Sequence, residues 1–152
     1  DSNYMPFLES PLSVAESMVH RNCNLPVQLC HHFCAPMVSK GKGAVVILGS
    51  GAAFAGASNM VAYAASKAFD MVFAEALFCE LKPKGVDVLG LILGETDTPA
   101  YVVDDCLAHL TDGPIRLANR KMRWGLRFLF PFSRNFIVSL MDKANKKVMG
   151  KG

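Results

Sequence analysis

A tyrosine and a lysine four residues apart are the clearest candidates for proton transfer in this chain. Tyr63 and Lys67 open a segment with helical periodicity, so their side chains share one face and can approach within about 6 Å. A free tyrosine has a pKa of about 10, and a nearby ammonium and the positive end of a helix both favour the ionised phenol. The spacing therefore predicts that Tyr63 acts as a general acid or base assisted by Lys67.

Ser50 is the third candidate, because it follows the short apolar run 44–48, which is typical of a strand buried in a parallel sheet. Ligands of such sheets bind beyond the carboxyl ends of the strands. We expect the hydroxyls of Ser50 and Tyr63 to converge on one oxygen atom and to polarise a C=O group toward hydride attack. Taken alone, Ser50 is equally well explained as a turn hydroxyl that bonds its own loop.

The elements that position these side chains follow from hydrophobic periodicity and turn residues. The expected order is helix 10–20, helix 24–38, strand 44–48, helix 62–81 and strand 86–93, with helical structure beyond Thr98. Glycine-containing turns at 40–43 and 82–85 end the two longer helices. A strand, a helix and a strand joined in this way form a parallel, right-handed unit. The predicted fold is α/β, a Rossmann-like doubly wound parallel sheet present only as its second half, with a helical C-terminal tail.

Length and composition favour a single structural unit. The chain has 152 residues, of which 51% are hydrophobic, enough for one core. We expect residues 1–113 to form the partial Rossmann-like catalytic domain and residues 114–152 a basic helical extension of the same unit. The apolar runs are all shorter than the roughly 20 residues that a membrane-spanning helix needs.

The candidate residues resemble a known family motif. Ser50 followed by Tyr63-Ala64-Ala65-Ser66-Lys67 is similar to the serine and the Tyr-x-x-x-Lys motif of short-chain dehydrogenases/reductases. Upstream, residues 24–37 resemble that family's fourth-helix segment, whose asparagine shapes a proton-relay water site, a role that falls to Asn24. Downstream, residues 93–98 resemble its Pro-Gly-x-x-x-Thr stretch, with Leu93 in place of the proline. The resemblance covers residues 8–98.

The resemblance implies an oxidoreductase that uses NAD or NADP and transfers hydride to or from a carbonyl or alcohol substrate. It assigns catalysis to Ser50, Tyr63, Lys67 and Asn24, and cofactor contacts to Tyr63, Lys67, Gly94, Thr96 and Thr98. The apolar neighbours Phe54, Met60 and Val102 indicate an apolar substrate.

The family's glycine-rich phosphate turn precedes all of these residues, so we expect this chain by itself to bind dinucleotide weakly or not at all. Relatives pair through helices that correspond to residues 24–38 and 63–81. The resemblance therefore also predicts a homo-oligomer.

The last part of the chain allows a different function. Residues 114–152 hold ten of the sixteen Lys and Arg but only one acid, Asp142, and aromatic residues such as Trp124 lie between the basic ones. This pattern suits a membrane surface, a nucleic acid or an acidic ligand. An ordinary helix pair explains it better, and we predict no nucleic-acid partner. The alternative function is a truncated, non-catalytic fragment that acts as an oligomerisation or interaction module.

The five cysteines include no Cys-x-x-Cys pair, which favours reduced thiols and a cytoplasmic location. The run Cys30-His31-His32-Phe33-Cys34 brings together residue types that bind metals. Successive helical residues point about 100° apart, so neither histidine can join a face shared by Cys30 and Cys34. We therefore predict helix packing and no metal.

Overall fold

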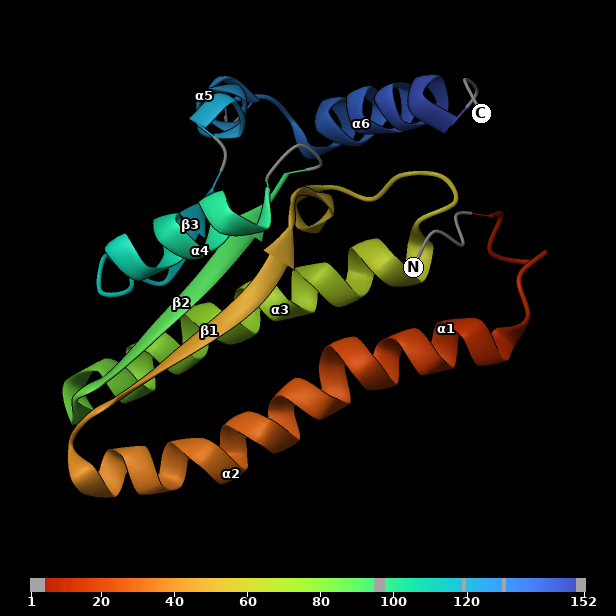
Figure 1. The fold of residues 1–152 in the computed structure, drawn as a ribbon. Coiled ribbons are helices and arrows are strands. Elements are labelled where there is room, and N and C mark those ends of the chain that lie inside the picture. Colours follow the sequence, from red (N-terminus) through yellow and green to blue (C-terminus); the bar gives the residue numbers. More distant parts are fainter. Residues whose placement is uncertain (1–4, 95–97, 119, 130, 150–152) are drawn as a thin grey trace.

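The protein folds as a layered α/β structure, as predicted. A computed structural model describes residues 5–94, 98–118, 120–129 and 131–149. The elements in chain order are α1 (Leu12–Val19), the π-helical turn η1 (His20–Asn24), α2 (Leu25–Lys40), β1 (Gly43–Ser50), η2 (Gly51–Phe54), α3 (Val61–Leu81), η3 (Lys82–Lys84), β2 (Val86–Leu93), α4 (Pro99–Ala108), β3 (Ile115–Leu117), α5 (Arg120–Leu129) and α6 (Arg134–Met149). Figure 1 shows the arrangement of these elements around the sheet.

The sheet is parallel, with the strand order β1-β2-β3. The register of β1 and β2 pairs Gly43 with Val86 at one end and Ser50 with Leu93 at the other. A strand buried on both faces carries a continuous apolar run in place of an alternating one, and β2 has this character. Its fully buried side chains form the centre of the core: Val86, Val88, Leu89, Leu91 and Ile92.

The strand β3 was not predicted, because the chain beyond Thr98 was expected to be helical. Three residues are too few to show periodicity, and tertiary pairing with β2 determines their conformation. Backbone hydrogen bonds from Gly90 N–H to Pro114 O (2.7 Å) and from Ala118 N–H to Ile92 O (3.0 Å) flank this pairing. The segment that follows residue 113 therefore begins as part of the sheet.

The predicted turns after the long helices are confirmed. Gly41 and Gly85 both have left-handed backbone angles, with φ of 62° and 79°, which glycine adopts without a side-chain clash. The two predicted amino-terminal helices, however, form one continuous helical run, in which η1 joins α1 to α2 (Figure 1). The break that the sequence indicated between residues 20 and 24 is thus a π-helical turn.

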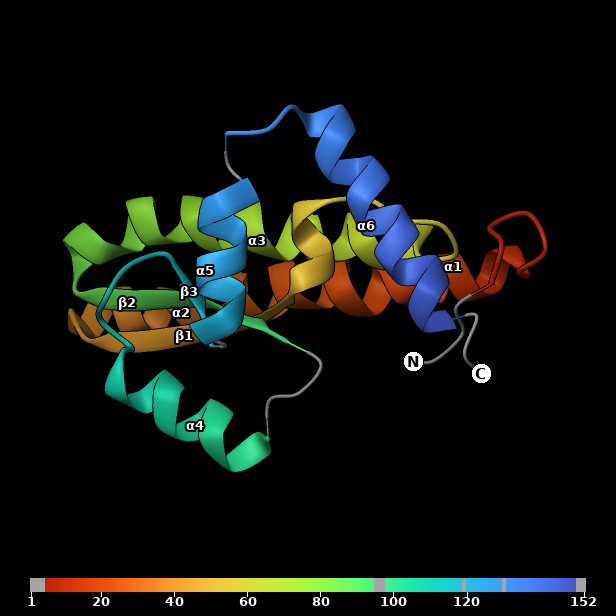
Figure 2. The same cartoon turned by 90° about the horizontal axis from the view of Figure 1, so that it is seen from above.

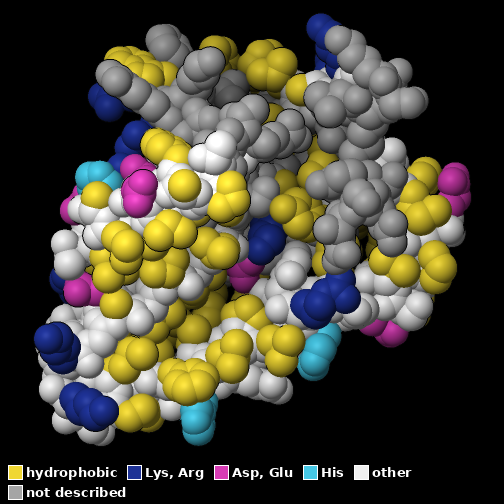
Figure 3. Space-filling view, in the orientation of Figure 1, with side chains coloured by type: hydrophobic (Ala, Val, Ile, Leu, Met, Phe, Trp, Pro, Cys, Tyr) yellow, Lys and Arg dark blue, Asp and Glu magenta, His cyan; other side chains and the backbone are white. Residues whose placement is uncertain are grey.

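The helices cover the sheet unevenly. In Figure 2, α3 lies on one side of the sheet and α4 on the other. Among the described residues, no strand pairs with the outer edge of β1, and Val46 and Leu48 remain 39% and 53% exposed. Hydrophobic side chains gather over the face formed by β1 and α2 (Figure 3). This open face is what a partial doubly wound sheet presents. No helix in the described part of the chain is both long and apolar enough to cross a bilayer.

Candidate functional site

A cleft lies at the carboxyl ends of the strands, where β1 ends at Ser50 and β2 ends beside it at Leu93. Its volume is about 560 Å³, and its lining includes the three predicted side chains of Ser50, Tyr63 and Lys67. Because parallel strands end on the same edge of a sheet, a loop after β1 and the first turn of α3 meet there. The structure therefore brings the serine, the tyrosine and the lysine to one site.

Ser50 has an extended backbone at the end of β1 and precedes the short helix η2. Its Oγ atom accepts a hydrogen bond of 3.3 Å from Ala52 N–H, which orients the side chain as a local cap. A hydroxyl that accepts one bond can still donate its own proton to a ligand. The turn role and the ligand role of Ser50 are therefore compatible.

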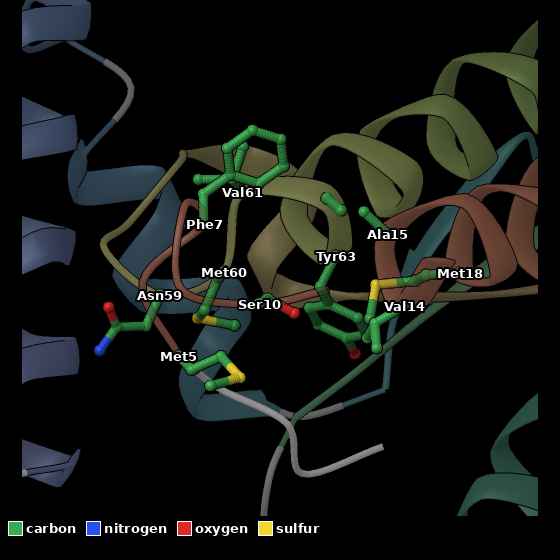
Figure 4. Close-up of a pocket in the computed structure, with 11 residues that line it drawn as sticks. Met5, Phe7, Ser10, Val14, Ala15, Met18, Asn59, Met60, Val61 and Tyr63 are labelled. Atoms are coloured by element: carbon green, nitrogen blue, oxygen red, sulfur yellow. The ribbon is translucent and has the colours of Figure 1, made fainter. Parts of the chain in front are cut away.

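Tyr63 lies at the junction of two hollows. Besides the cleft, it lines a hollow of about 40 Å³ at the start of α1, and Figure 4 shows its ring beside Ser10, Val14 and Met18. Binding pockets for small molecules have volumes of roughly 300–1,000 Å³, so this hollow is too small for a substrate. The amino-terminal segment and α1 instead pack against Tyr63 at this hollow.

Lys67 is held by two acceptors that lie on different elements. Its Nζ atom donates to the backbone oxygen of Leu48 in β1 and to Oδ2 of Asp70 in α3, both at 2.9 Å. Asp70 is only 2% exposed; burial raises the pKa of its carboxyl group, against the opposing effect of the hydrogen bond and charge of Lys67. Sequence reasoning identified Lys67 but missed Asp70. The signal was an acid three residues after the lysine on the same helix.

The predicted relay residue Asn24 lies away from the cleft. It is exposed at the end of η1, and its side chain makes no capping bond to α2. Asn22, two residues earlier, is the asparagine that reaches α3: its Nδ2 donates to Ser66 Oγ at 2.9 Å, and Ser66 Oγ donates to the backbone oxygen of Tyr63 at 2.9 Å. The π-helical turn redirects the side chains of this segment, which the sequence spacing could not reveal.

The predicted cofactor contacts after β2 are only partly in the cleft. Gly94 lines it, whereas Thr98 is exposed and its Oγ1 accepts a hydrogen bond of 3.4 Å from Tyr101 N–H as the cap of α4. Thr96 lies outside the described residues. The structure thus supports the capping role of Thr98, which is one of the ordinary roles of threonine.

The basic carboxyl-terminal helices contribute to the site. Met122 of α5 and Met141 of α6 line the cleft. Asp142 of α6 accepts a hydrogen bond from Ser58 N–H at 2.8 Å and forms an ion pair with Lys146 at 2.7 Å. The bond from Lys146 has the largest effect and that from Ser58 the next, and together they hold the pKa of Asp142 well below its usual range. One wall of the cleft therefore comes from the tail, a feature that the sequence did not indicate.

The cysteine and histidine run of α2 packs as the helical spacing predicts. Cys30 and Cys34 are buried in the core, whereas His31 and His32 are exposed. Burial raises the pKa of Cys30 to about 11, with a smaller effect from Cys34. In the described ranges of the chain, no three His, Cys, Asp or Glu side chains are grouped as a metal site requires.

Comparison with known proteins identifies the family. A family model described as short chain dehydrogenase matches residues 2–103. The chain belongs to the short-chain dehydrogenase family. It is 30% identical over 106 residues to a 7beta-hydroxysteroid dehydrogenase of Collinsella aerofaciens and 28% identical to one of Mediterraneibacter gnavus. The matched region is 70% of this chain but only 38% of each relative.

Solved structures share the fold at lower sequence identity. A 7beta-hydroxysteroid dehydrogenase structure aligns with a TM-score of 0.84 and 21% identity, over 91% of this chain and 61% of that one. A bulky-bulky ketone specific alcohol dehydrogenase from Comamonas testosteroni aligns with a TM-score of 0.69 and 23% identity, over 97% of this chain and 57% of that one. A short-chain dehydrogenase from Sphingobium yanoikuyae in complex with NADPH aligns with a TM-score of 0.71 and 21% identity, over 97% and 60%.

Proposed function

We propose that this chain supplies the proton-transfer site of an oxidoreductase that uses NAD or NADP and acts on a bulky, apolar ketone or secondary alcohol. The observation that carries the proposal is the single cleft of about 560 Å³ lined by Ser50, Tyr63 and Lys67. In the reductive direction the carbonyl carbon gains hydride and the carbonyl oxygen gains a proton. Tyr63 donates that proton, Ser50 donates a hydrogen bond to the same oxygen, and the reverse reaction returns the proton to Tyr63.

The residues of the cleft fit a nicotinamide cofactor. A bound nicotinamide would supply or accept the hydride. Lys67 has three N–H donors, of which Leu48 O and Asp70 take two, so one remains for a polar group in the cleft. Gly94 offers a lining without a side chain. Asn22, through Ser66, fixes the first turn of α3 and so the position of Tyr63.

The walls of the cleft support a bulky apolar substrate. Met60 precedes α3, and Met122 and Met141 come from the carboxyl-terminal helices. Methionine is flexible and fills irregular apolar surfaces, which suits a large ring system better than a small polar alcohol. The names of the relatives, 7beta-hydroxysteroid dehydrogenase and bulky-bulky ketone specific alcohol dehydrogenase, agree with this class.

The test is turnover of Tyr63→Phe with hydroxysteroids and bulky aryl ketones, followed by the absorbance of NADH and NADPH. We expect kcat to fall about 1,000-fold with an unchanged circular dichroism spectrum. Tyr101→Phe is the matched control, because the Tyr101 hydroxyl bonds Ala118 O at 2.7 Å in another part of the fold. Equal turnover of Tyr63→Phe and the parent protein would refute the proposal.

A further inference from the structure

Asp70 is a buried carboxylate whose hydrogen bonds are incomplete. The residue is 2% exposed, and Oδ2 accepts the bond from Lys67. Its other oxygen, Oδ1, has no hydrogen-bond partner within the described ranges of the chain. Removing a carboxylate oxygen from water without a replacement bond opposes folding. Stability alone therefore gives no reason for an acid at this position.

The effect of Asp70 on Lys67 gives such a reason. The lysine side chain is long and flexible, and its ammonium carries three donors. Leu48 O and Asp70 Oδ2 fix two of them at 2.9 Å. Lys67 and Leu48 both line the cleft and the groove that Asp70 lines between β1 and α2. The anchor thus holds the ammonium at the boundary between the two, and one of its three N–H groups remains for a ligand.

The charges around the pair come from few elements. On α3 itself, Tyr63 lines the same cleft as Lys67 of the pair. From η1, Cys23 is close enough that the charge of Asp70 contributes, after burial, to raising its pKa, while Lys67 lowers it. From α2, Cys30 lines the same groove as Asp70, and β1 carries no ionisable side chain. Asp70 is therefore the acid that offsets the charge of Lys67.

We propose that Asp70 is a positioning residue for proton transfer. It holds Lys67 so that one N–H faces the cleft, and its negative charge offsets the ammonium and so sets the pH at which Tyr63 exchanges its proton. The inference rests on the proposed function, because it assigns Asp70 a role in the same reaction. Asp70 acts through Lys67 and does not touch the substrate.

Two substitutions separate the charge of Asp70 from its anchoring bond. Asp70→Asn keeps the shape and an oxygen acceptor but removes the charge. We expect the acidic limb of the pH–rate profile for alcohol oxidation to move to lower pH by about 1 unit, with KM changed less than about twofold. Asp70→Leu removes the anchor as well, and we expect both kcat to fall about tenfold and the melting temperature to fall, because the ammonium of Lys67 loses its charged partner.

A purely structural role of Asp70 predicts a change in melting temperature without a change in the pH–rate profile. A lower melting temperature of Asp70→Asn with an unchanged pH–rate profile would overturn the inference. The NMR signal of the Lys67 ammonium (¹⁵Nζ) is a readout that does not depend on turnover. We expect its protons to be protected from exchange with water in the parent protein, and the signal to be lost in Asp70→Leu. If Tyr63→Phe turns over as fast as the parent protein, the proposed function fails by itself. The Nζ signal then still tests whether Asp70 holds Lys67 in position, and an unchanged signal in Asp70→Leu would overturn this inference.

Discussion

Asp142 in α6 accepts a hydrogen bond of 2.8 Å from the backbone N–H of Ser58, which lies 84 residues earlier in the loop before α3. The bond joins the last helix to the loop that borders the cleft, and Met141, the residue before Asp142, faces that cleft. The carboxylate is charged at neutral pH, since its bonds to Lys146 and Ser58 lower its pKa. Charge-assisted hydrogen bonds between Asp142 and Ser58 therefore help to position the apolar wall.

Asp142→Ala is expected to release α6 from this loop. Without the acceptor, the wall formed by Met141 becomes less ordered, and KM for a bulky ketone should rise about threefold to tenfold, which corresponds to the loss of roughly one hydrogen bond. Lys146→Met is the control, because it removes the ion pair at 2.7 Å and leaves the Ser58 bond intact. Amide exchange at Ser58 measures the bond directly. Equal Ser58 protection in Asp142→Ala and the parent protein would contradict this prediction.

The pair of Asp105 and Arg116 should make stability depend on pH. Two bonds of 2.6 Å join these side chains, which are 8% and 15% exposed, and so fasten α4 to β3. The bonds from Arg116 hold the pKa of Asp105 below its ordinary value of 3.8. A lowered folded-state pKa means that this stabilisation is present above about pH 4 and is lost as pH falls through the folded-state pKa.

Asp105→Asn should therefore lower the free energy of unfolding by about 2 kcal/mol at neutral pH and reduce its decline in acid. Urea denaturation between pH 7 and pH 3 measures both effects. The control is Asp112→Asn, because Asp112 is 53% exposed and lies 3.9 Å from Arg116, and exposed pairs contribute little. The same acid dependence in Asp105→Asn as in the parent protein would exclude the pair as its source.

Gly90 in β2 should tolerate no side chain. A Cβ atom there would lie 2.6 Å from Cδ1 of Ile115, 3.0 Å from Cβ of Ala74 and 3.1 Å from the backbone oxygen of Pro114. Gly90→Ala should destabilise the protein by about 1–3 kcal/mol, since packed cores resist added atoms. Thermal denaturation provides the measurement.

Gly125→Ala is the control for Gly90→Ala. Gly125 lies in α5 with nothing within 4 Å of an added Cβ, so alanine should stabilise that helix by up to about 1 kcal/mol. A Gly90→Ala variant as stable as the parent protein would show that β3 can move away from β2.

The local pattern of the sequence predicted the elements that carry the candidate site residues. The apolar runs gave β1 and β2, the turns at Gly41 and Gly85 marked the ends of the helices before them, and the spacing of Tyr63 and Lys67 placed both at the start of α3. These features depend on periodicity and on backbone preferences over a few residues. The family was also predictable, because its motif residues lie on these same elements.

Contacts between distant segments could not be predicted in the same way. The strand β3 exists because β2 pairs with it, and Met141 lines the cleft on a helix that bonds the loop at Ser58. Asn22 reaches α3 in place of Asn24 because the π-helical turn redirects the side chains of η1. Each depends on register and packing across the fold, which one-dimensional spacing does not contain.

By itself, the sequence determined that Ser50 ends a strand and that Tyr63 and Lys67 begin a helix, because a serine after a strand and a Tyr-x-x-x-Lys helix are local arrangements. Only the tertiary structure decided what surrounds them: the buried Asp70 beside Lys67, the asparagine that supports the first turn of α3, and the apolar wall from the tail. The physical reason is that backbone conformation follows from neighbours along the chain, whereas burial, charge pairing and cleft shape follow from neighbours in space.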